Sequence, residues 1–426
     1  MKHTKEDEEE YDMSRLSIRT YLVTAKRYLR QAIQDKGTAS FVIGNESADL
    51  DSITCALVYG YIQSSSPQAR RKNHVVIPVT NIPAADLSLR PELTALLRHA
   101  GVKPDDLITL DDLGKLPMPL SKTDWTLVDH NALTGCLAQH YAPSVSGVID
   151  HHDDESAVPS SASPRIIEKS GSCNSLVVNQ LRSSWDDISS NSTSVGAANA
   201  QSSDGVIDDE AYTTTWDAQV AELALGSILI DTHCLGDESK VTEHDRKAVR
   251  YLEARINASN KYGKDYDRKV FFEEINAAKS DLDALSLIDV LRKDYKQWTE
   301  GAKTVGVSSV VKPISWLREK VEGNFTQTLI DFAGQRQLQL LAIMTAFTSE
   351  SGDFARELLL IALDSEGATK AAERFVEQAA SELKIKQSEL QSLSEKGRPP
   401  FMQLWHQKNV AASRKKVGPL LREAMR

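Results

Sequence analysis

The chain has 426 residues, 41% of them hydrophobic and 26% charged, a composition typical of globular domains and not of disordered chains. Its length predicts two domains of ordinary size. The formal net charge is −10, from 50 basic and 60 acidic residues, which argues against non-specific nucleic-acid binding, because that binding needs cations that neutralise phosphates.

No apolar run approaches the roughly 20 residues that a membrane-spanning helix needs, and "MKHTKEDEEE" lacks the apolar segment of a signal peptide. The four cysteines, Cys55, Cys136, Cys173 and Cys234, form no Cys-x-x-Cys pair. This spacing fits small, buried, reduced thiols better than a disulfide framework or a zinc site. We therefore expect a cytoplasmic protein that does not bind membranes.

The first part of the chain predicts a doubly wound α/β domain over residues 13–262. Residues 13–36 read as an amphipathic helix that ends before Gly37. From there to about residue 235, short apolar runs alternate with helical stretches, which is the pattern of a parallel sheet with crossover helices. The candidate strands are "SFVIG", "HVVIPV", "LITL", "WTLVD", "SGVID" and "GSILID".

Two polar stretches divide the chain further. Residues 183–209 are rich in Ser, Asn and Asp without periodicity, which predicts a disordered surface insertion. The segment "ASNKYGKDYDRK" reads as a linker, and a helical part (271–298), three apolar strands, a long helix (368–394) and "FMQLWHQ" follow it. This order predicts a second, smaller α/β domain over residues 265–426.

Acidic residues follow four of the candidate strands. A lone Asp in such a place is usually a helix N-cap or a turn residue. Four strands that each end at an Asp indicate more than a cap or turn. The carboxyl ends of the strands of a doubly wound sheet meet at the crevice where ligands bind, so these acidic residues would lie together. The residues are Asp49 and Asp51, then Asp129 with His130, then Asp150 with His151 and His152, and finally Asp231.

Carboxylates gathered at one edge raise one another's pKa unless a cation compensates them. Carboxylate oxygens with one or two imidazoles suit Mg²⁺ or Mn²⁺, and a bridging carboxylate suits a metal pair of the kind found in two-metal phosphatases. The pattern therefore predicts a metal site at the carboxyl edge of the first domain.

The order Asn-x-x-x-Asp-x-Asp from Asn45, "LVDH", "DHH" and "LIDT" resembles the DHH phosphoesterase superfamily, and "SGSCNSLVVNQL" (170–181) resembles its helix between the third and fourth motifs. Family II pyrophosphatases start the first motif with His, whereas Asn45 is similar to the fungal exopolyphosphatases and the animal prune proteins. Prune-like proteins tend to have Asp-His-Arg in the third motif. The intact Asp150-His151-His152 therefore favours the exopolyphosphatase branch.

The resemblance implies a fold, an activity and a set of site residues. The fold is a DHH domain plus a smaller C-terminal α/β substrate-binding domain, with the active site in the crevice between them. The activity is metal-dependent hydrolysis of the terminal phosphoanhydride bonds of inorganic polyphosphate, with release of orthophosphate. Two divalent cations are implied, with Mg²⁺ favoured over Mn²⁺ or Co²⁺.

The implied residue roles follow the same resemblance. Asp49 would bind one metal ion, Asp51, His151 and Asp231 the other, and Asp129 both, with Asn45 as a further candidate ligand. His152 would contact the bridging or leaving oxygen. Lys296 in "LRKDYKQW", and Arg414 and Lys415 in "ASRKKVGPLL", would bind phosphates, because Arg contacts phosphate oxygens bidentately and Lys adds a point charge. "SRKK" alone is more often a solvated patch.

Two other interpretations remain open at this point. One is a pyrophosphatase or nucleotide phosphodiesterase on the same scaffold, and Asn45 argues against the pyrophosphatase. The other is a prune-like regulatory protein, which a degenerate metal site would favour. The sequence does not predict chain-length preference, oligomeric state or regulation.

Overall fold

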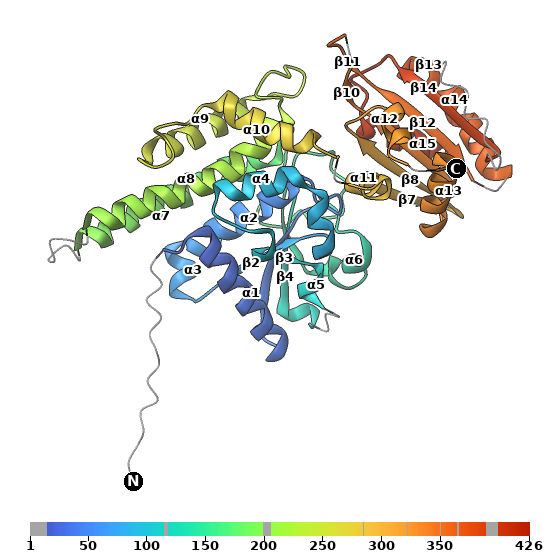
Figure 1. The fold of residues 1–426 in the computed structure, drawn as a ribbon. Helices are drawn as coiled ribbons and strands as arrows, with labels where there is room; N and C mark the ends of the chain where they lie inside the picture. Colours follow the sequence, from blue (N-terminus) through green and yellow to red (C-terminus); the bar gives the residue numbers. More distant parts are fainter. Residues whose placement is uncertain are drawn as a thin grey trace. The chain divides into compact units, whose positions relative to one another are not determined.

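The structure is a computed structural model that describes residues 15–114, 118–198, 206–283, 285–321, 323–349, 351–363, 366–388 and 399–426. It divides into two compact units (Figure 1), residues 1–87 with 91–278, and residues 88–90 with 279–426. The division at residue 278 lies later than the predicted linker near residue 262. The reason is α10 (Arg268–Ser280), which buries Phe271, Phe272 and Ile275 in the core of the first unit.

The first unit is built on a six-stranded parallel sheet, which confirms the predicted architecture. The strand order is β3-β2-β1-β4-β5-β6, so the order reverses between β1 and β4 as a doubly wound sheet requires. The strands are β1 (Ala39–Ile43), β2 (Val76–Thr80), β3 (Ile108–Thr109), β4 (Thr123–Val128), β5 (Val145–Asp150) and β6 (Arg165–Ile167).

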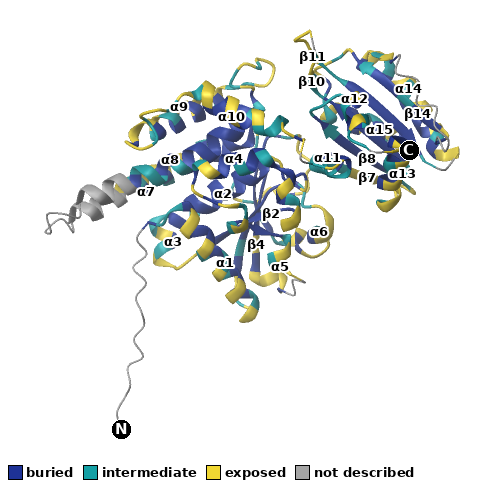
Figure 2. Cartoon of the chain, in the orientation of Figure 1, coloured by how far each residue is buried: buried dark blue, intermediate teal, exposed yellow. Residues whose placement is uncertain are grey.

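Helices cover both faces of this sheet, as an all-parallel sheet requires. Figure 2 shows that α2 is almost entirely buried, and its sequence is apolar on every side. Among the described residues, the structure contains no helix with the length and hydropathy of a membrane span. Before α10, the helices are α1 (Ile18–Gln34), α2 (Leu50–Ser65), α3 (Pro67–Arg71), α4 (Pro91–His99), α5 (Leu110–Leu113), α6 (Gly135–Tyr141), α7 (Cys173–Ala198), α8 (Val206–Asp231) and α9 (Glu243–Ala258).

Two predictions for this unit are wrong. The predicted disordered insertion at 183–209 is helical where it is described: residues 183–198 continue α7, α8 begins at Val206, and residues 199–205 lie outside the described part. Trp185 and Ile188 are buried in the core, and the indole N–H of Trp185 donates to Asp217 at 2.6 Å, so this polar stretch packs as a helix through its two apolar residues. "GSILID" ends α8 and is not a strand, because a short buried apolar run fits either element.

The cysteines agree only in part with the prediction that all four are buried. Cys55 and Cys173 are buried, Cys234 is half-buried and Cys136 is exposed. Among the described residues, all four are free thiols.

The second unit is a six-stranded mixed sheet with helices on both faces. The strand order is β13-β14-β12-β9-β8-β7, with β8 and β9 parallel and the other pairs antiparallel. The strands are β7 (Tyr295–Glu300), β8 (Lys303–Val310), β9 (Leu340–Thr345), β12 (Glu357–Ala362), β13 (Ile385–Gln387) and β14 (Phe401–Gln407), beside the small pair β10 (Phe347–Thr348) and β11 (Phe354–Ala355).

Each face of this sheet has its own apolar core. One core joins the sheet to α14 and α15, and the other joins it to α11, α12 and α13. The predicted helix over 368–394 ends at Leu383 in the structure, and β13 follows it at once. The helices are α11 (Leu287–Lys293), α12 (Ile314–Glu319), α13 (Phe325–Gln335), α14 (Glu366–Leu383) and α15 (Arg414–Met425).

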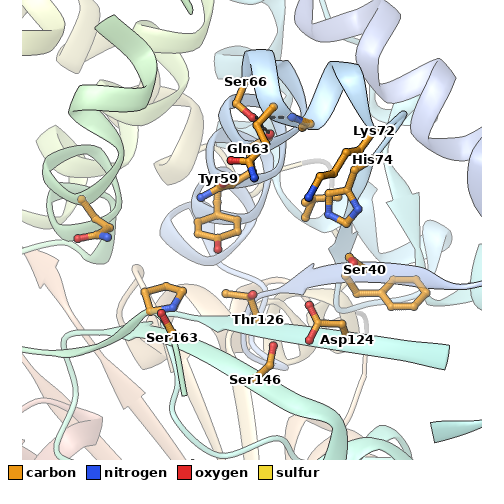
Figure 3. Close-up of a pocket in the computed structure, with 16 residues that line it drawn as sticks. Ser40, Tyr59, Gln63, Ser66, Lys72, His74, Asp124, Thr126, Ser146 and Ser163 are labelled. Atoms are coloured by element: carbon orange, nitrogen blue, oxygen red, sulfur yellow. Dashed lines mark hydrogen bonds between the residues drawn. The ribbon is translucent and has the colours of Figure 1, made fainter. Parts of the chain in front are cut away.

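The parallel sheet gives the first unit two distinct edges. Asp129 and Asp150 lie at the carboxyl ends of β4 and β5. A cavity of about 570 Å³ lies near the opposite edge, where the first residues of β1, β4 and β5 line it together with α2 (Figure 3).

Candidate metal centre

Asp129 lies where the chain leaves β4, next to the point at which the strand order reverses. Its backbone N–H still donates to the carbonyl oxygen of Ile149 on β5 at 3.0 Å. Its φ angle is 60°, in the left-handed region that few residues other than Gly, Asn and Asp adopt. Such strained backbone gathers at functional sites, where the surrounding contacts hold it in place.

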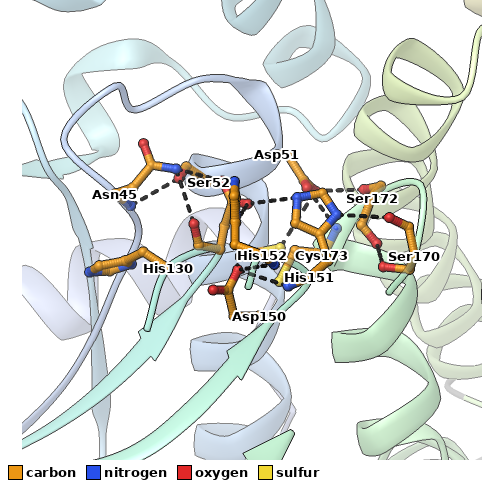
Figure 4. A network of polar contacts seen from close by, with 12 residues as sticks. Asn45, Asp51, Ser52, His130, Asp150, His151, His152, Ser170, Ser172 and Cys173 are labelled. Carbon is orange, nitrogen blue, oxygen red and sulfur yellow. Dashed lines mark hydrogen bonds and ion pairs between the residues drawn. The ribbon is translucent and has the colours of Figure 1, made fainter. Parts of the chain in front are cut away.

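Asp129, His151 and His152 form the one group among the described residues in which three metal-ligating side chains meet. Their candidate ligand atoms all lie within 4.8 Å of one another. Nε2 of His151 is 3.2 Å from Oδ1 of Asp129, and Nδ1 of His152 is 3.8 Å from that oxygen. Figure 4 shows the two imidazoles and the neighbouring polar side chains.

Two side chains from the first motif hold the other oxygen of Asp129. Nδ2 of Asn45 and Oγ of Ser52 each donate to Oδ2 of Asp129 at 2.8 Å. Oδ1 of Asn45 accepts from the backbone N–H of Ser47 at 2.8 Å. Both ends of the Asn45 amide therefore make protein contacts, and Ser52 is a site residue that the sequence analysis missed.

Asp150 orients His152. Its Oδ1 is 2.7 Å from Nδ1 of His152, and its Oδ2 accepts from Nδ2 of Asn131 at 2.6 Å. Burial opposes ionisation, but the hydrogen bond and charge of His152 outweigh it, so the pKa of Asp150 lies well below its ordinary value. An ionised Asp150 accepts a hydrogen bond from Nδ1 of His152, which leaves the other ring nitrogen, Nε2, available to contact a ligand. Asn131 was also missed, although it stands two residues after Asp129.

Asp51 is buried against the N-terminus of α7. Its Oδ1 accepts from Oγ of Ser172 at 2.6 Å, and its Oδ2 accepts from the backbone N–H of Cys173 at 2.7 Å. The positive end of the helix dipole favours a carboxylate in this place. The stretch "SGSCNSLVVNQL" therefore belongs to the site, because its first turn holds a predicted metal ligand.

Asp49 and Asp231 lie outside the group of three. Asp49 is exposed and is the N-cap of α2, where its Oδ1 accepts from the backbone N–H of Ser52 at 3.0 Å. Asp231 is the last residue of α8 and is half-buried. Their role as metal ligands stays a prediction. In this structure Asp49 has the helix N-cap role that is usual for a lone Asp after a strand.

The donor set fits a divalent cation. Burial, followed by the charge of Asp129, raises the pKa of Asp51. Burial also opposes ionisation of Asp129, but His151 and His152 outweigh it and lower the pKa of Asp129. Two buried carboxylates that disfavour each other's ionisation, beside two imidazoles, form a site that a cation would stabilise.

The predicted phosphate-binding residues lie in the second unit. Nη2 of Arg414 is 2.7 Å from Oδ1 of Asp294, and its Nη1 donates to the Asp294 carbonyl oxygen at 3.0 Å. Burial opposes ionisation of Asp294, but Arg414 first and then Lys296 lower its pKa. Lys296 and Arg414 thus lie around one carboxylate, and Lys415 is exposed in the first turn of α15.

Comparison with known proteins identifies the family. The model of the DHHA2 domain matches residues 273–424. A Schizosaccharomyces pombe protein named "Putative exopolyphosphatase" is 35% identical over 423 residues, which cover 96% of this chain and 99% of that protein. The mouse protein "Exopolyphosphatase PRUNE1" is 27% identical over 402 residues, covering 93% of this chain and 77% of that protein.

A solved structure supports the fold. The crystal structure of a Methanococcus jannaschii "putative family II inorganic pyrophosphatase" matches with a TM-score of 0.53 and 19% identity, covering 90% of this chain and 99% of that chain. The fold, the Asp129–His151–His152 group and the near-full-length relatives agree: this chain belongs to the DHH phosphoesterase superfamily, in the branch with a DHHA2 domain that includes the exopolyphosphatase and prune proteins.

Proposed function

We propose that this protein is an exopolyphosphatase, which hydrolyses terminal phosphoanhydride bonds of inorganic polyphosphate and releases orthophosphate. The observation that carries the proposal is the 35% identity, over nearly the full length of both chains, to a protein named as an exopolyphosphatase. The group Asp129, His151 and His152 supports it, because a regulatory relative with a degenerate site would not need these three side chains together.

We propose two divalent cations as cofactors, Mg²⁺ in the first place and Mn²⁺ or Co²⁺ as alternatives. Asp129 and His151 would hold them together with Asp51, Asp49 and Asp231. When bound, such ions supply Lewis-acid stabilisation of charge on phosphate oxygens and lower the pKa of water. Asn45 would act chiefly through Asp129, since its amide donates to that carboxylate.

The chain's own groups would bind and orient the phosphate chain. His152, held by Asp150, presents Nε2 on the side away from that carboxylate, and its side chain is 27% exposed. It would contact the bridging or leaving oxygen through Nε2 and, when both ring nitrogens carry a proton, would donate the Nε2 proton there as the anhydride bond breaks. Lys296, Arg414 and Lys415 would bind phosphate oxygens further along the chain. A crevice between the two units and a cytoplasmic location stay predictions.

Phosphate release from four substrates tests the proposal. Long-chain polyphosphate, tripolyphosphate, pyrophosphate and a cyclic nucleotide are compared with Mg²⁺, Mn²⁺ and Co²⁺, and a sample without metal serves as the control. We expect the highest kcat/KM on polyphosphate or tripolyphosphate. Preference for pyrophosphate or the cyclic nucleotide would replace the proposal by one of the two alternative activities, and no turnover with any metal would favour a regulatory protein.

A further inference from the structure

The cavity near the amino edge of the parallel sheet is a second polar site in the first unit. Ser40, Asp124 and Ser146 are each the second residue of their strands, and they form its floor (Figure 3). Asp129, at the far end of β4, is five residues from Asp124. At about 3.3 Å per residue this places Asp124 about 17 Å along the strand from Asp129 in the metal centre. Its volume of about 570 Å³ is that of a small-molecule site.

The basic and acidic side chains that line the cavity lie in different parts of it. Lys72 and His74, from the segment between α3 and β2, stand together on one side, and Asp124 lies on the floor (Figure 3). Within the described part of the chain, none of these three side chains forms an ion pair. The Lys72 ammonium and the neighbouring His74 imidazole are therefore available to an anion from solvent, while the floor offers a carboxylate.

Hydroxyl and amide groups fill the space between these charges. Tyr59 is buried in the roof, from α2, and Thr126 lies below it on β4. Burial raises the pKa of Tyr59, so its hydroxyl stays protonated, and Thr126 and Gln63 lie within hydrogen-bonding reach of it. Gln63 lies beside Tyr59 in the roof. A lining of this kind suits a ligand that carries several hydroxyl groups.

We propose that this cavity binds a phosphate monoester of a hydroxyl-rich molecule, such as a nucleoside or sugar monophosphate. Lys72 and His74 contact the phosphate, because an ammonium and an imidazole N–H both donate to phosphate oxygens. Asp124 accepts hydrogen bonds from the ligand's hydroxyl groups, as an acidic residue does from ribose in dinucleotide-binding domains.

The acidic floor of the cavity also disfavours the binding of a polyanion. A phosphate chain long enough to fill the cavity would lie against the Asp124 carboxylate and be repelled by it. A monoester places its single charged end at Lys72 and His74 and its neutral part over Asp124. The site is thus chemically different from one for inorganic polyphosphate, and the proposal does not rest on the exopolyphosphatase activity.

Calorimetry on the full-length, metal-stripped protein tests the proposal. The probes are adenosine monophosphate, glucose 6-phosphate, inorganic phosphate, adenosine and tripolyphosphate. We expect saturable binding of at least one monoester, weaker binding of inorganic phosphate and adenosine, and no tripolyphosphate binding at this site. Lys72→Gln weakens monoester binding about tenfold, and Asp124→Asn weakens the monoester but strengthens inorganic phosphate, because a repulsive charge is gone.

Lys247→Gln, an exposed lysine on α9, is the matched control and leaves binding unchanged. Hydrolysis of polyphosphate by Lys72→Gln and Asp124→Asn stays at the wild-type level, which separates this site from the metal centre. Absence of saturable monoester binding overturns the proposal. Binding that is insensitive to both substitutions also overturns it, because the ligand then lies elsewhere.

Discussion

Among the single residues of the site, Asp129 is the most constrained by its surroundings. It is buried, has a left-handed backbone, and contacts His151 on one carboxylate oxygen and Asn45 and Ser52 on the other. His151 and His152 keep its carboxylate ionised in spite of burial. These contacts keep a charged carboxylate in a buried position. Removal of that charge is therefore the sharpest test of the site.

Asp129→Asn keeps the size of the side chain and removes its charge. We expect kcat on polyphosphate to fall by at least about a thousandfold, as when a main electrostatic element of a catalytic site is lost. The melting temperature should change little, because Asn also tolerates the left-handed backbone. Asp187→Asn, an exposed position on α7, is the matched control. More than about a tenth of wild-type kcat at saturating metal would contradict the assignment.

Asn45 is where this chain departs from the pyrophosphatase pattern. Histidine offers a nitrogen ligand that favours Mn²⁺ or Co²⁺ over Mg²⁺, whereas the Asn45 amide is engaged with Asp129 and Ser47. Asn45→His should therefore tighten Mn²⁺ binding and shift metal preference away from Mg²⁺, measured by calorimetry and by activity. Asn45→Ala removes the contact with Asp129 without adding a ligand. If the His and Ala variants have the same Mn²⁺ affinity, residue 45 does not contact the metal.

At the scale of secondary-structure elements, α9 supports the site through the first turn of α7. Asp245 on α9 is fully buried and accepts from the backbone N–H groups of Gly171 and Ser172, at 2.9 and 3.3 Å, and from Oγ of Ser175 at 2.6 Å. The same turn of α7 holds Asp51. Asp245 therefore acts on the predicted metal ligand through the backbone of another helix.

Asp245→Ala should lower both stability and metal affinity. Several buried donors lose their acceptor, and each unsatisfied group costs about 1–3 kcal/mol, so we expect a loss of several kcal/mol in the free energy of unfolding. Urea denaturation measures this loss, and calorimetry measures Mn²⁺ affinity at a temperature where the variant is folded. Asp245→Asn, which keeps acceptor capacity, should retain more of both. A destabilised variant with wild-type metal affinity would show that α9 has no influence on Asp51.

The first turn of α15 offers a matched pair of lysines. Lys415 is exposed and predicted to bind substrate phosphate, while the next residue, Lys416, forms an ion pair with Glu382. Lys415→Ala should raise KM for polyphosphate several-fold, because uniform binding energy is lost, and leave metal affinity unchanged. Lys416→Ala should leave both unchanged. Equal kinetics in the two variants would make "SRKK" the solvated patch that such a run usually is.

At the scale of the whole molecule, stability should depend on pH through a buried acid that the proposed chemistry does not use. Burial, followed by the charge of Glu274, raises the pKa of Glu222 to about 8. Oε2 of Glu222 is 3.7 Å from Nδ1 of His99, and Nε2 of His99 is 3.3 Å from Oε2 of Glu274. These contacts join α8, α10 and the end of α4, so they affect the stability of the first unit as a whole.

The folded chain holds the Glu222 proton more tightly than the unfolded chain, whose value is near the ordinary 4.5. This contribution to stability is therefore complete below about pH 4.5 and is lost as the pH rises to about 8. Glu222→Gln removes the dependence, so its free energy of unfolding should fall less than that of the wild type between about pH 5 and about pH 8. Glu273→Gln, exposed on α10, is the control, and equal slopes in urea denaturation would contradict the assignment.

The class of fold and the family can be predicted from the amino-acid sequence alone. Apolar runs followed by Asp and His predicted β4 with Asp129 after it, and β5 with His151 and His152 after it. These side chains meet because the carboxyl ends of paired parallel strands lie at the same edge of the sheet. The Asn45 and Asp150-His151-His152 motifs then selected one branch of one superfamily, and a relative with 35% identity agrees.

Which elements cover these side chains depends on tertiary packing and could not be predicted from the sequence. "GSILID" is helical and residues 183–190 are ordered in α7 because neighbouring helices bury them, and a local pattern does not record which neighbour is present. The support of Asp51 by α7 and of α7 by Asp245 joins residues more than 70 positions apart. Such contacts depend on the packing of whole elements, whereas the end of a strand depends on a short stretch of chain. The sequence therefore predicted the strand ends but not the long-range contacts.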